Sequence, residues 1–91
     1  MLDIETEEIL QSLPNIGPSS WLMLERAGIP TTEAVIKLGA VRCYLAVIES
    51  GGKPSLNLLY AIAAGLEGRS WQDLNVEEKG RLNRELADLR D

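Results

Sequence analysis

The sequence predicts an all-α fold, a compact bundle of five to six short helices that contains a helix-hairpin-helix and is SAM-like or HhH-like in arrangement. Three observations predict it. Hydrophobic residues make up 45% of the chain, and because Leu, Ile, Val and Ala carry this fraction while Phe is absent, helices are favoured over strands. Apolar residues also recur at helical spacing in several segments. Glycines and prolines separate these segments at the short intervals typical of helical domains.

The length of the chain, 91 residues, suits one hydrophobic core, so we expect a single domain over residues 1–91. The first residues lack the basic and apolar regions of a signal peptide, and no segment is apolar for long enough to cross a bilayer. The lone cysteine, Cys43, has no second cysteine or histidine with which to form a disulfide or a metal site, so we expect an inert buried thiol. These features indicate a cytoplasmic protein with no membrane segment and no bound metal.

The first helix is expected over residues 6–12, where Ile9 and Leu13 lie one helical turn apart after an acidic stretch. The run LPNIGP at residues 13–18 then ends it, since proline cannot continue a helix but fits the first position of a new one. This run predicts a tight hairpin between two helices. We expect Gly17 to turn with positive φ or to lie where a Cβ has no room.

The second helix is expected from Pro18 to Ala27, because Gly28 can adopt the left-handed conformation that ends a helix. Ile29 should then fold back onto the helix as a hydrophobic plug. A short third helix, capped by the hydroxyl of Thr31, should run through Leu38 and end at Gly39.

A fourth helix is predicted by an apolar stripe at helical spacing, and it should end at the run SGG of residues 50–52. The stripe consists of Val41, Tyr44, Leu45 and Ile48. The next helix, with Ser55 as its cap, is apolar nearly all round and should be the buried centre of the core, including Leu59. Asn57, near its start, is interpreted as a buried amide with a structural hydrogen-bonding role.

The last part of the chain predicts a capped single turn over residues 70–73 and a final helix. Asn75 and Glu78 have the spacing of a reciprocal capping pair at the start of that helix. Its inward stripe is expected to be Leu82, Leu86 and Leu89, while Glu77, Glu78 and Glu85 are expected to face solvent. Trp21 and Trp71 are interpreted as core or half-buried anchors whose indole N–H groups bond to carbonyls.

The hairpin offers a way to hold phosphate, because backbone N–H groups at the start of its second helix have no intrahelical acceptor. The candidate nucleic-acid-binding residues are Asn15, Ile16, Gly17, Ser19 and Ser20, with Arg26 and Lys53 as supporting bases and Arg69 as a further isolated base. The net charge of −5 has the wrong sign for a protein whose affinity comes from neutralising phosphates. The hairpin therefore also has a purely structural interpretation, in which it only joins two packed helices.

Several blocks of the sequence together resemble the C-terminal domain of the TfoX/Sxy competence regulators. The blocks are LPNIGPSSW from residue 13, AGI from residue 27, LGAV from residue 38, SLNLLYA from residue 55, and Trp71. The resemblance extends from Leu13 to Leu74 and implies a helix-hairpin-helix fold, a link to the regulation of natural-competence genes, and no known catalysis. Regulators of this family often carry a separate N-terminal α/β domain, so the chain resembles a stand-alone form.

No combination of residues predicts catalysis. Histidine is absent, Cys43 has no activating neighbour in the sequence, and neither of the glycine-rich nucleotide-binding motifs occurs. We therefore expect a protein that is not an enzyme and needs no cofactor, metal or small-molecule substrate. The preferred function is a regulatory domain that acts through protein–protein contacts, with a partner protein or by self-association. The alternative is a nucleic-acid-binding regulator that holds phosphate with the hairpin amides.

Overall fold

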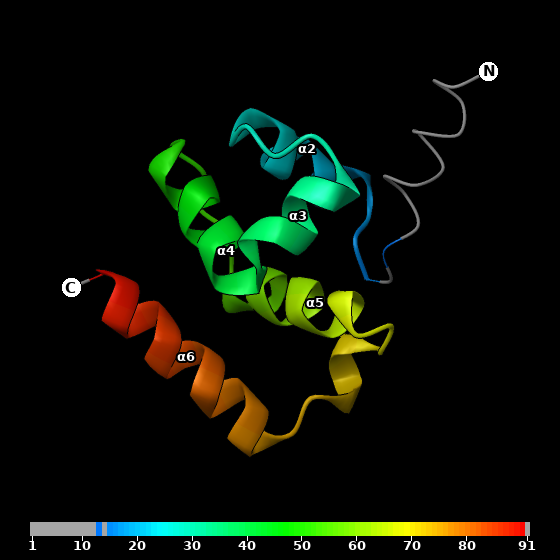
Figure 1. Ribbon diagram of the computed structural model, residues 1–91, viewed down its shortest axis with the longest axis vertical. Helices are drawn as coiled ribbons and strands as arrows, with labels where there is room; N and C mark the ends of the chain where they lie inside the picture. The colour runs from blue at the N-terminus through cyan, green and yellow to red at the C-terminus, as the bar shows by residue number, and fades with distance from the viewer. Residues whose placement is uncertain (1–12, 14, 91) are drawn as a thin grey trace.

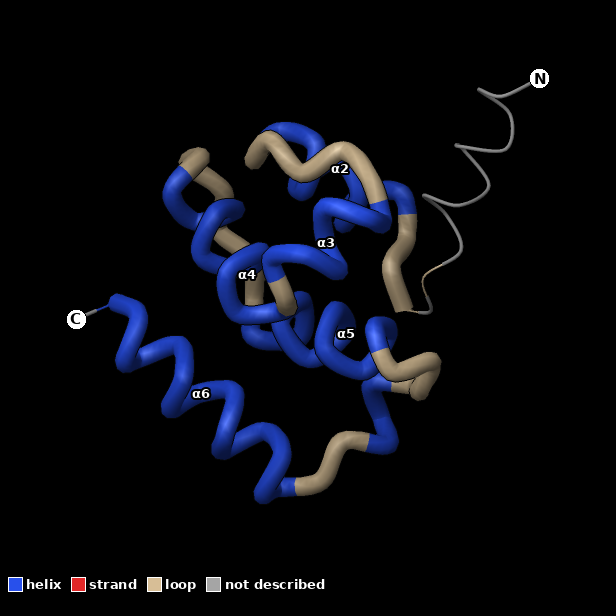
Figure 2. The backbone as a smooth tube through the Cα atoms, in the orientation of Figure 1, coloured by secondary structure: helices blue, strands red, loops and turns tan. Residues whose placement is uncertain are grey.

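The computed structural model describes residues 13 and 15–90, so the helix expected over residues 6–12 lies outside the described part of the chain. The described residues form five α-helices and one 3-10 helix and contain no strand, which confirms the all-α prediction (Figure 2). The helices are α2 (Pro18–Arg26), α3 (Thr32–Leu38), α4 (Ala40–Glu49), α5 (Leu56–Leu66), the 3-10 helix η1 (Trp71–Asp73) and α6 (Val76–Arg90).

Helix α2 ends one residue earlier than expected, but, as predicted, it ends because Gly28 is left-handed and Ile29 folds back onto the helix. Gly28 has a φ of +83°, and the N–H of Ile29 donates to the carbonyl of Leu24 over 2.9 Å, which turns Ile29 back into the core. Helix α3 begins where the hydroxyl of Thr31 accepts a hydrogen bond from the backbone N–H of Ala34 at 3.1 Å. These short-range signals were sufficient to predict both helices.

Helices α4 and α5 pack against each other and form the centre of the core. Leu59 on α5 has no exposed surface, as predicted, but Leu56 is 42% exposed because it begins the helix at the edge of the core. The hydroxyl of Ser55 makes no capping bond. Asn57 is exposed rather than buried, since at this point of α5 the next two residues, both leucines, face the core. The predicted structural role for Asn57 is therefore wrong.

Helix α6 lies along one side of the domain against α4 and α5 (Figure 1). The predicted capping pair at its start is present: the N–H of Glu78 donates to Oδ1 of Asn75 at 2.8 Å, and the N–H of Asn75 donates to Oε1 of Glu78 at 3.1 Å. Leu86 is buried and Leu82 is partly buried. Leu89, expected on the inward stripe, is exposed because the core that α6 covers ends at Leu86.

Cys43 on α4 is fully buried, and this burial raises the pKa of its thiol to about 11. A thiol with such a pKa is almost entirely protonated at neutral pH and is a poor nucleophile. Among the residues that the structure describes, no helix is long and apolar enough to span a membrane.

Candidate interaction surface at the hairpin

The backbone of the hairpin turns at Asn15 rather than at Gly17. Asn15 has a φ of +72°, a left-handed conformation that asparagine tolerates better than most residues. Gly17 has an ordinary φ of −91°, and a Cβ built on it meets no atom within 4 Å. The prediction that Gly17 needs positive φ or a missing side chain is therefore wrong, because the residue before Ile16 makes the turn instead.

The side chain of Asn15 ties the hairpin to two distant parts of the chain. Its Nδ2 donates to the carbonyl oxygen of Ala61 on α5 at 3.3 Å and to that of Arg69 at 2.9 Å. Its Oδ1 accepts a hydrogen bond from the backbone N–H of Trp71 at 3.3 Å. An amide that satisfies three backbone groups within the protein has little capacity left for an external ligand.

The other predicted hairpin residues lie in three different environments. Ile16 is buried and belongs to the core. Gly17 is the N-cap residue of α2 and has no side chain with which to cap it, while Pro18 at the first helical position has no N–H. The backbone amides of Ser19 and Ser20 are thus left without a side-chain cap, with Ser19 exposed and Ser20 half-buried.

A groove of about 310 Å³ runs beside the hairpin, between the N-terminal halves of α2 and α5 and the 3-10 helix. We call it the hairpin groove. Among the described residues its lining carries no charged side chain and consists of Asn15, Ser20, Met23, Ser55, Asn57, Leu58, Ala61 and Trp71. The groove therefore has an apolar surface formed by Met23, Leu58 and Ala61 and a polar surface of amides and hydroxyls.

The two tryptophans differ in a way that the sequence did not reveal. Trp21 is buried in the apolar core, as predicted, but its indole N–H has no hydrogen-bond partner, so the predicted bond to a carbonyl is absent. Trp71 is 37% exposed, and the interpretation of this residue as part of the core is wrong. The apolar side chain that this segment buries is Leu74, which leaves the indole of Trp71 at the groove.

The predicted supporting bases do not line the hairpin groove. Arg26 lies at the end of α2 and lines a separate hollow of about 130 Å³ with Met23 and the turn after α4. Lys53 is exposed in the loop between α4 and α5, two residues before Ser55. Of the predicted site residues, the structure thus brings only Asn15 and Ser20 together in this groove.

Arg69 is committed to contacts within the protein rather than exposed as an isolated base. Its Nη1 donates to Oε2 of Glu78 at 2.6 Å and to Oε1 of Glu67 at 2.9 Å, and its Nη2 donates to Oε1 of Glu78 at 3.1 Å and to the carbonyl of Asp73 at 2.8 Å. Only 20% of the Glu78 side chain is exposed, so the expectation that Glu78 faces solvent is wrong. The reason is that the capping position of Glu78 also places its carboxylate beside Arg69.

These contacts change the pKa of Glu78. The hydrogen bond from Arg69 and, after it, the backbone N–H of Asn75 lower the pKa of Glu78 from 4.5 to about 2. The same pairing raises the pKa of Arg69. The pair is therefore fully ionised at neutral pH.

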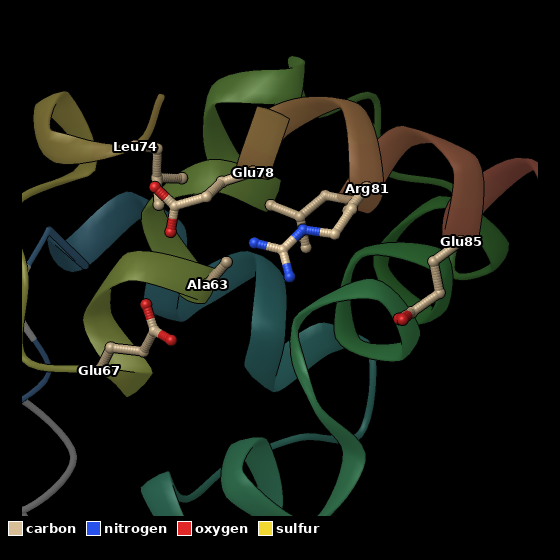
Figure 3. Close-up of a pocket in the computed structure, with 7 residues that line it drawn as sticks. Ala63, Glu67, Leu74, Glu78, Arg81 and Glu85 are labelled. Atoms are coloured by element: carbon tan, nitrogen blue, oxygen red, sulfur yellow. The ribbon is translucent and has the colours of Figure 1, made fainter. Parts of the chain in front are cut away.

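A second groove, of about 250 Å³, lies between α5 and α6 and is lined in part by Glu78 of this ion pair. We call it the α6 groove; its lining residues are Ala63, Glu67, Leu74, Glu78, Arg81, Leu82 and Glu85. Figure 3 shows Arg81 reaching from α6 toward α5, with Glu78 and Glu67 on one side of it and Glu85 on the other. Its carboxylates and the guanidinium of Arg81 give this groove a charged lining, whereas the described lining of the hairpin groove carries no charged side chain.

Sequence reasoning missed the exposure of Trp71 and the pairing of Arg69 with Glu78. The available signal for the second was the capping position of Glu78, nine residues after a lone arginine. No local signal reports the first, because the backbone of Trp71 is held by a hydrogen bond to Asn15, which is 56 residues away in the chain.

The described helices and the groove together define a small all-α fold with an uncharged groove beside the turn that precedes α2. The family model of the TfoX C-terminal domain matches residues 6–86, so the chain belongs to the TfoX C-terminal domain family, which is a family of regulatory domains and not a known enzyme family. A crystal structure of an uncharacterized protein from Listeria monocytogenes, in a triclinic form, is similar with a TM-score of 0.77 and 28% sequence identity, covering 89% of this chain and 92% of that chain. No curated protein matches the chain.

Proposed function

We propose that this chain is a non-catalytic regulatory domain of the TfoX type that binds a protein segment, from a partner protein or from a second copy of the chain, in the hairpin groove. In this proposal residues 1–91 form one domain, which works in the cytoplasm in the regulation of natural-competence genes to which the family resemblance points. The observation that supports the proposal is the uncharged lining of a groove that presents the exposed indole of Trp71.

The chemistry of the groove suits a protein ligand. Tryptophan and methionine are enriched at the buried centres of protein interfaces, and here Trp71 and Met23 line one groove. The backbone N–H of Trp71 donates to Oδ1 of Asn15, so the backbone that carries this indole is already ordered before a partner binds. The amide of Asn57 and the hydroxyl of Ser55 supply hydrogen-bonding groups at the polar side for the backbone of a partner.

The same lining is poorly suited to nucleic acid. Phosphate contacts supply most of the non-specific affinity of nucleic-acid-binding proteins, and they come chiefly from lysine and arginine. Neither Arg26 nor Lys53 lines the groove, and Arg69 is paired with carboxylates. The amide of Asn15 is occupied by backbone groups of the protein itself.

Site-specific photo-crosslinking tests this proposal directly. A photoreactive phenylalanine analogue replaces Trp71 in the full chain, and the matched control carries it in place of Ile36, which is 61% exposed on α3 and lines neither groove. After irradiation in a native lysate, we expect a protein adduct from position 71 that is absent from position 36. Identical adducts from both positions, or adducts only with nucleic acid, would contradict the proposal.

The partner in this proposal is a different protein or a second copy of the chain. Sedimentation of the purified chain at several concentrations separates the two cases, because self-association depends on concentration. A concentration-dependent dimer with a crosslink between two copies at position 71 would identify the partner as a second copy.

The nucleic-acid alternative keeps one specific observation in its favour. The amides of Ser19 and Ser20 lie at the start of a nine-residue helix without a side-chain cap, and such amides can donate hydrogen bonds to a phosphate oxygen. This alternative places the ligand at the N-terminal end of α2 and predicts binding that weakens as salt increases.

A further inference from the structure

The segment that joins α5 to α6 forms a wall of both grooves. We call residues 67–75 the connecting segment; it includes the yellow and gold part of the chain in Figure 1. Trp71 in this segment lines the hairpin groove, whereas Glu67 and Leu74 line the α6 groove. Any movement of the connecting segment therefore changes both grooves at once.

Two sets of polar contacts hold this segment from opposite sides, and they meet at Arg69. On the hairpin side, Asn15 bonds to the carbonyl of Arg69 and to the N–H of Trp71. On the α6 side, the guanidinium of Arg69 bonds to both carboxylate oxygens of Glu78, which also caps the first turn of α6 through Asn75. Arg69 thus belongs to the hairpin network through its backbone and to the α6 network through its side chain.

We propose that Arg69 makes the hairpin groove and the docking of α6 interdependent. A protein segment bound against Trp71 in its present position stabilises the connecting segment, and with it the contact between Arg69 and Glu78 at the start of α6. By thermodynamic reciprocity, release of α6 weakens binding in the hairpin groove by the same factor. The consequence for binding rests on the proposed function, whereas the coupling itself is a property of the free chain.

Helix α6 is the element of the described structure best suited to respond. Of its fifteen residues only Leu86 is buried, with Leu82 partly buried beside it. An element with little buried apolar surface opens locally at a lower free energy than the core does. The charge-assisted bidentate contact with Arg69 is a polar contact at its first turn, and further along the helix Nδ2 of Asn83 donates to the hydroxyl of Tyr60 on α5 at 2.9 Å.

Amide hydrogen exchange in the free chain measures this coupling without a ligand. Exchange at Trp71 reports its bond to Asn15, and exchange at Lys79, whose N–H donates to the carbonyl of Asn75 at 3.0 Å, reports the first turn of α6. Exchange at Leu59, which is fully buried, reports unfolding of the whole domain. Rates at these three amides distinguish a local coupling from a general loss of stability.

Glu78→Gln removes the charge that Arg69 binds, and Glu85→Gln is the matched control on the same helix and groove. We expect Glu78→Gln to accelerate exchange at Trp71 by about fivefold or more, the lower end of usual coupling energies, and by more than it accelerates exchange at Leu59. Glu85→Gln should leave the rate at Trp71 within about twofold, since no bond joins Glu85 to Arg69 among the described residues. Faster exchange at Lys79 with an unchanged rate at Trp71 would overturn the proposal, and so would equal acceleration at all three amides.

Asn15→Gly tests whether a change on the hairpin side reaches the start of α6. It tests the coupling even if Glu78→Gln does not fold. Glycine keeps the positive φ of this position and removes only the side-chain amide. We expect faster exchange at Lys79, on the far side of Arg69, by a similar factor. Acceleration confined to Trp71 would show that the two networks are independent. Because these measurements need no partner, a failed crosslink and a failed coupling are distinguishable.

Discussion

The side-chain amide of Asn15 donates a hydrogen bond to the backbone carbonyl of Arg69, 54 residues further along the chain and 2.9 Å away. This contact joins the hairpin to the segment that carries Trp71 and positions one wall of the hairpin groove. It also shows that an asparagine in this turn serves two purposes. Its backbone adopts the left-handed conformation, and its side chain satisfies three backbone groups at once.

Two substitutions of Asn15 separate these purposes. Asn15→Gly removes the amide but keeps the positive φ, and leaving part-buried carbonyls without a donor should cost about 1–3 kcal/mol in the free energy of unfolding. Asn15→Ala also forces an unfavourable φ, which should cost about 1–2 kcal/mol more. Urea denaturation of both variants measures the difference. Equal stabilities would show that the backbone conformation of this turn is not a source of strain.

Gly17→Ala should be nearly neutral, in contrast to the usual expectation for a glycine in a hairpin. Its φ is negative and its Cβ would meet open space, so the gain in chain entropy of about 0.4–1 kcal/mol offsets the poorer N-cap preference of alanine. We expect a net change within about 1 kcal/mol by denaturation. Gly28→Ala is the control, and it should lose about 1–2 kcal/mol because Gly28 has a φ of +83°. A larger loss for Gly17→Ala than for Gly28→Ala would contradict the turn geometry.

Leu59→Ala should destabilise the domain by about 2–5 kcal/mol, because it empties a fully buried position at the centre of α5. Leu56→Ala, three residues earlier on the same helix and 42% exposed, should cost less than about 1 kcal/mol. Thermal or urea unfolding of the two variants provides the comparison. Similar losses would show that the burial of α5 is assigned to the wrong face.

The Arg69–Glu78 pair predicts a specific pH dependence. The folded pKa of Glu78 is about 2, below its ordinary 4.5, so its ionisation stabilises the folded state above about pH 4.5, and this contribution is lost as the pH falls toward 2. Glu78→Gln keeps a capping side chain but has no charge to titrate. The difference in unfolding free energy between wild type and variant should therefore be larger at pH 7 than at pH 2.5. The same difference at both pH values would rule out this role for the carboxylate.

Local sequence signals predicted the helices well, whereas contacts between distant residues determined the groove. Gly28, Thr31 and the Asn75–Glu78 pair act within one helical turn, so their effects follow from short stretches of sequence. The exposure of Trp71 and the internal bonds of Asn15 depend on partners that only the folded chain brings together.

Asn57 also shows that local sequence does not report contacts between distant parts of the chain. An amide in an apolar helix suggests burial, but the phase of α5 directs it to solvent. That phase is set by the packing of α5 against α4, which the sequence around Asn57 does not report.

Titration of a fluorescently labelled DNA duplex with the full chain at low salt distinguishes a hairpin groove that binds protein from a hairpin that binds nucleic acid. We expect no binding up to high micromolar protein, because no lysine or arginine among the described residues lines the hairpin groove. Saturable binding at low micromolar concentration that weakens with salt, and that is lost in a folded Ser19→Ala/Ser20→Ala double variant, would contradict it.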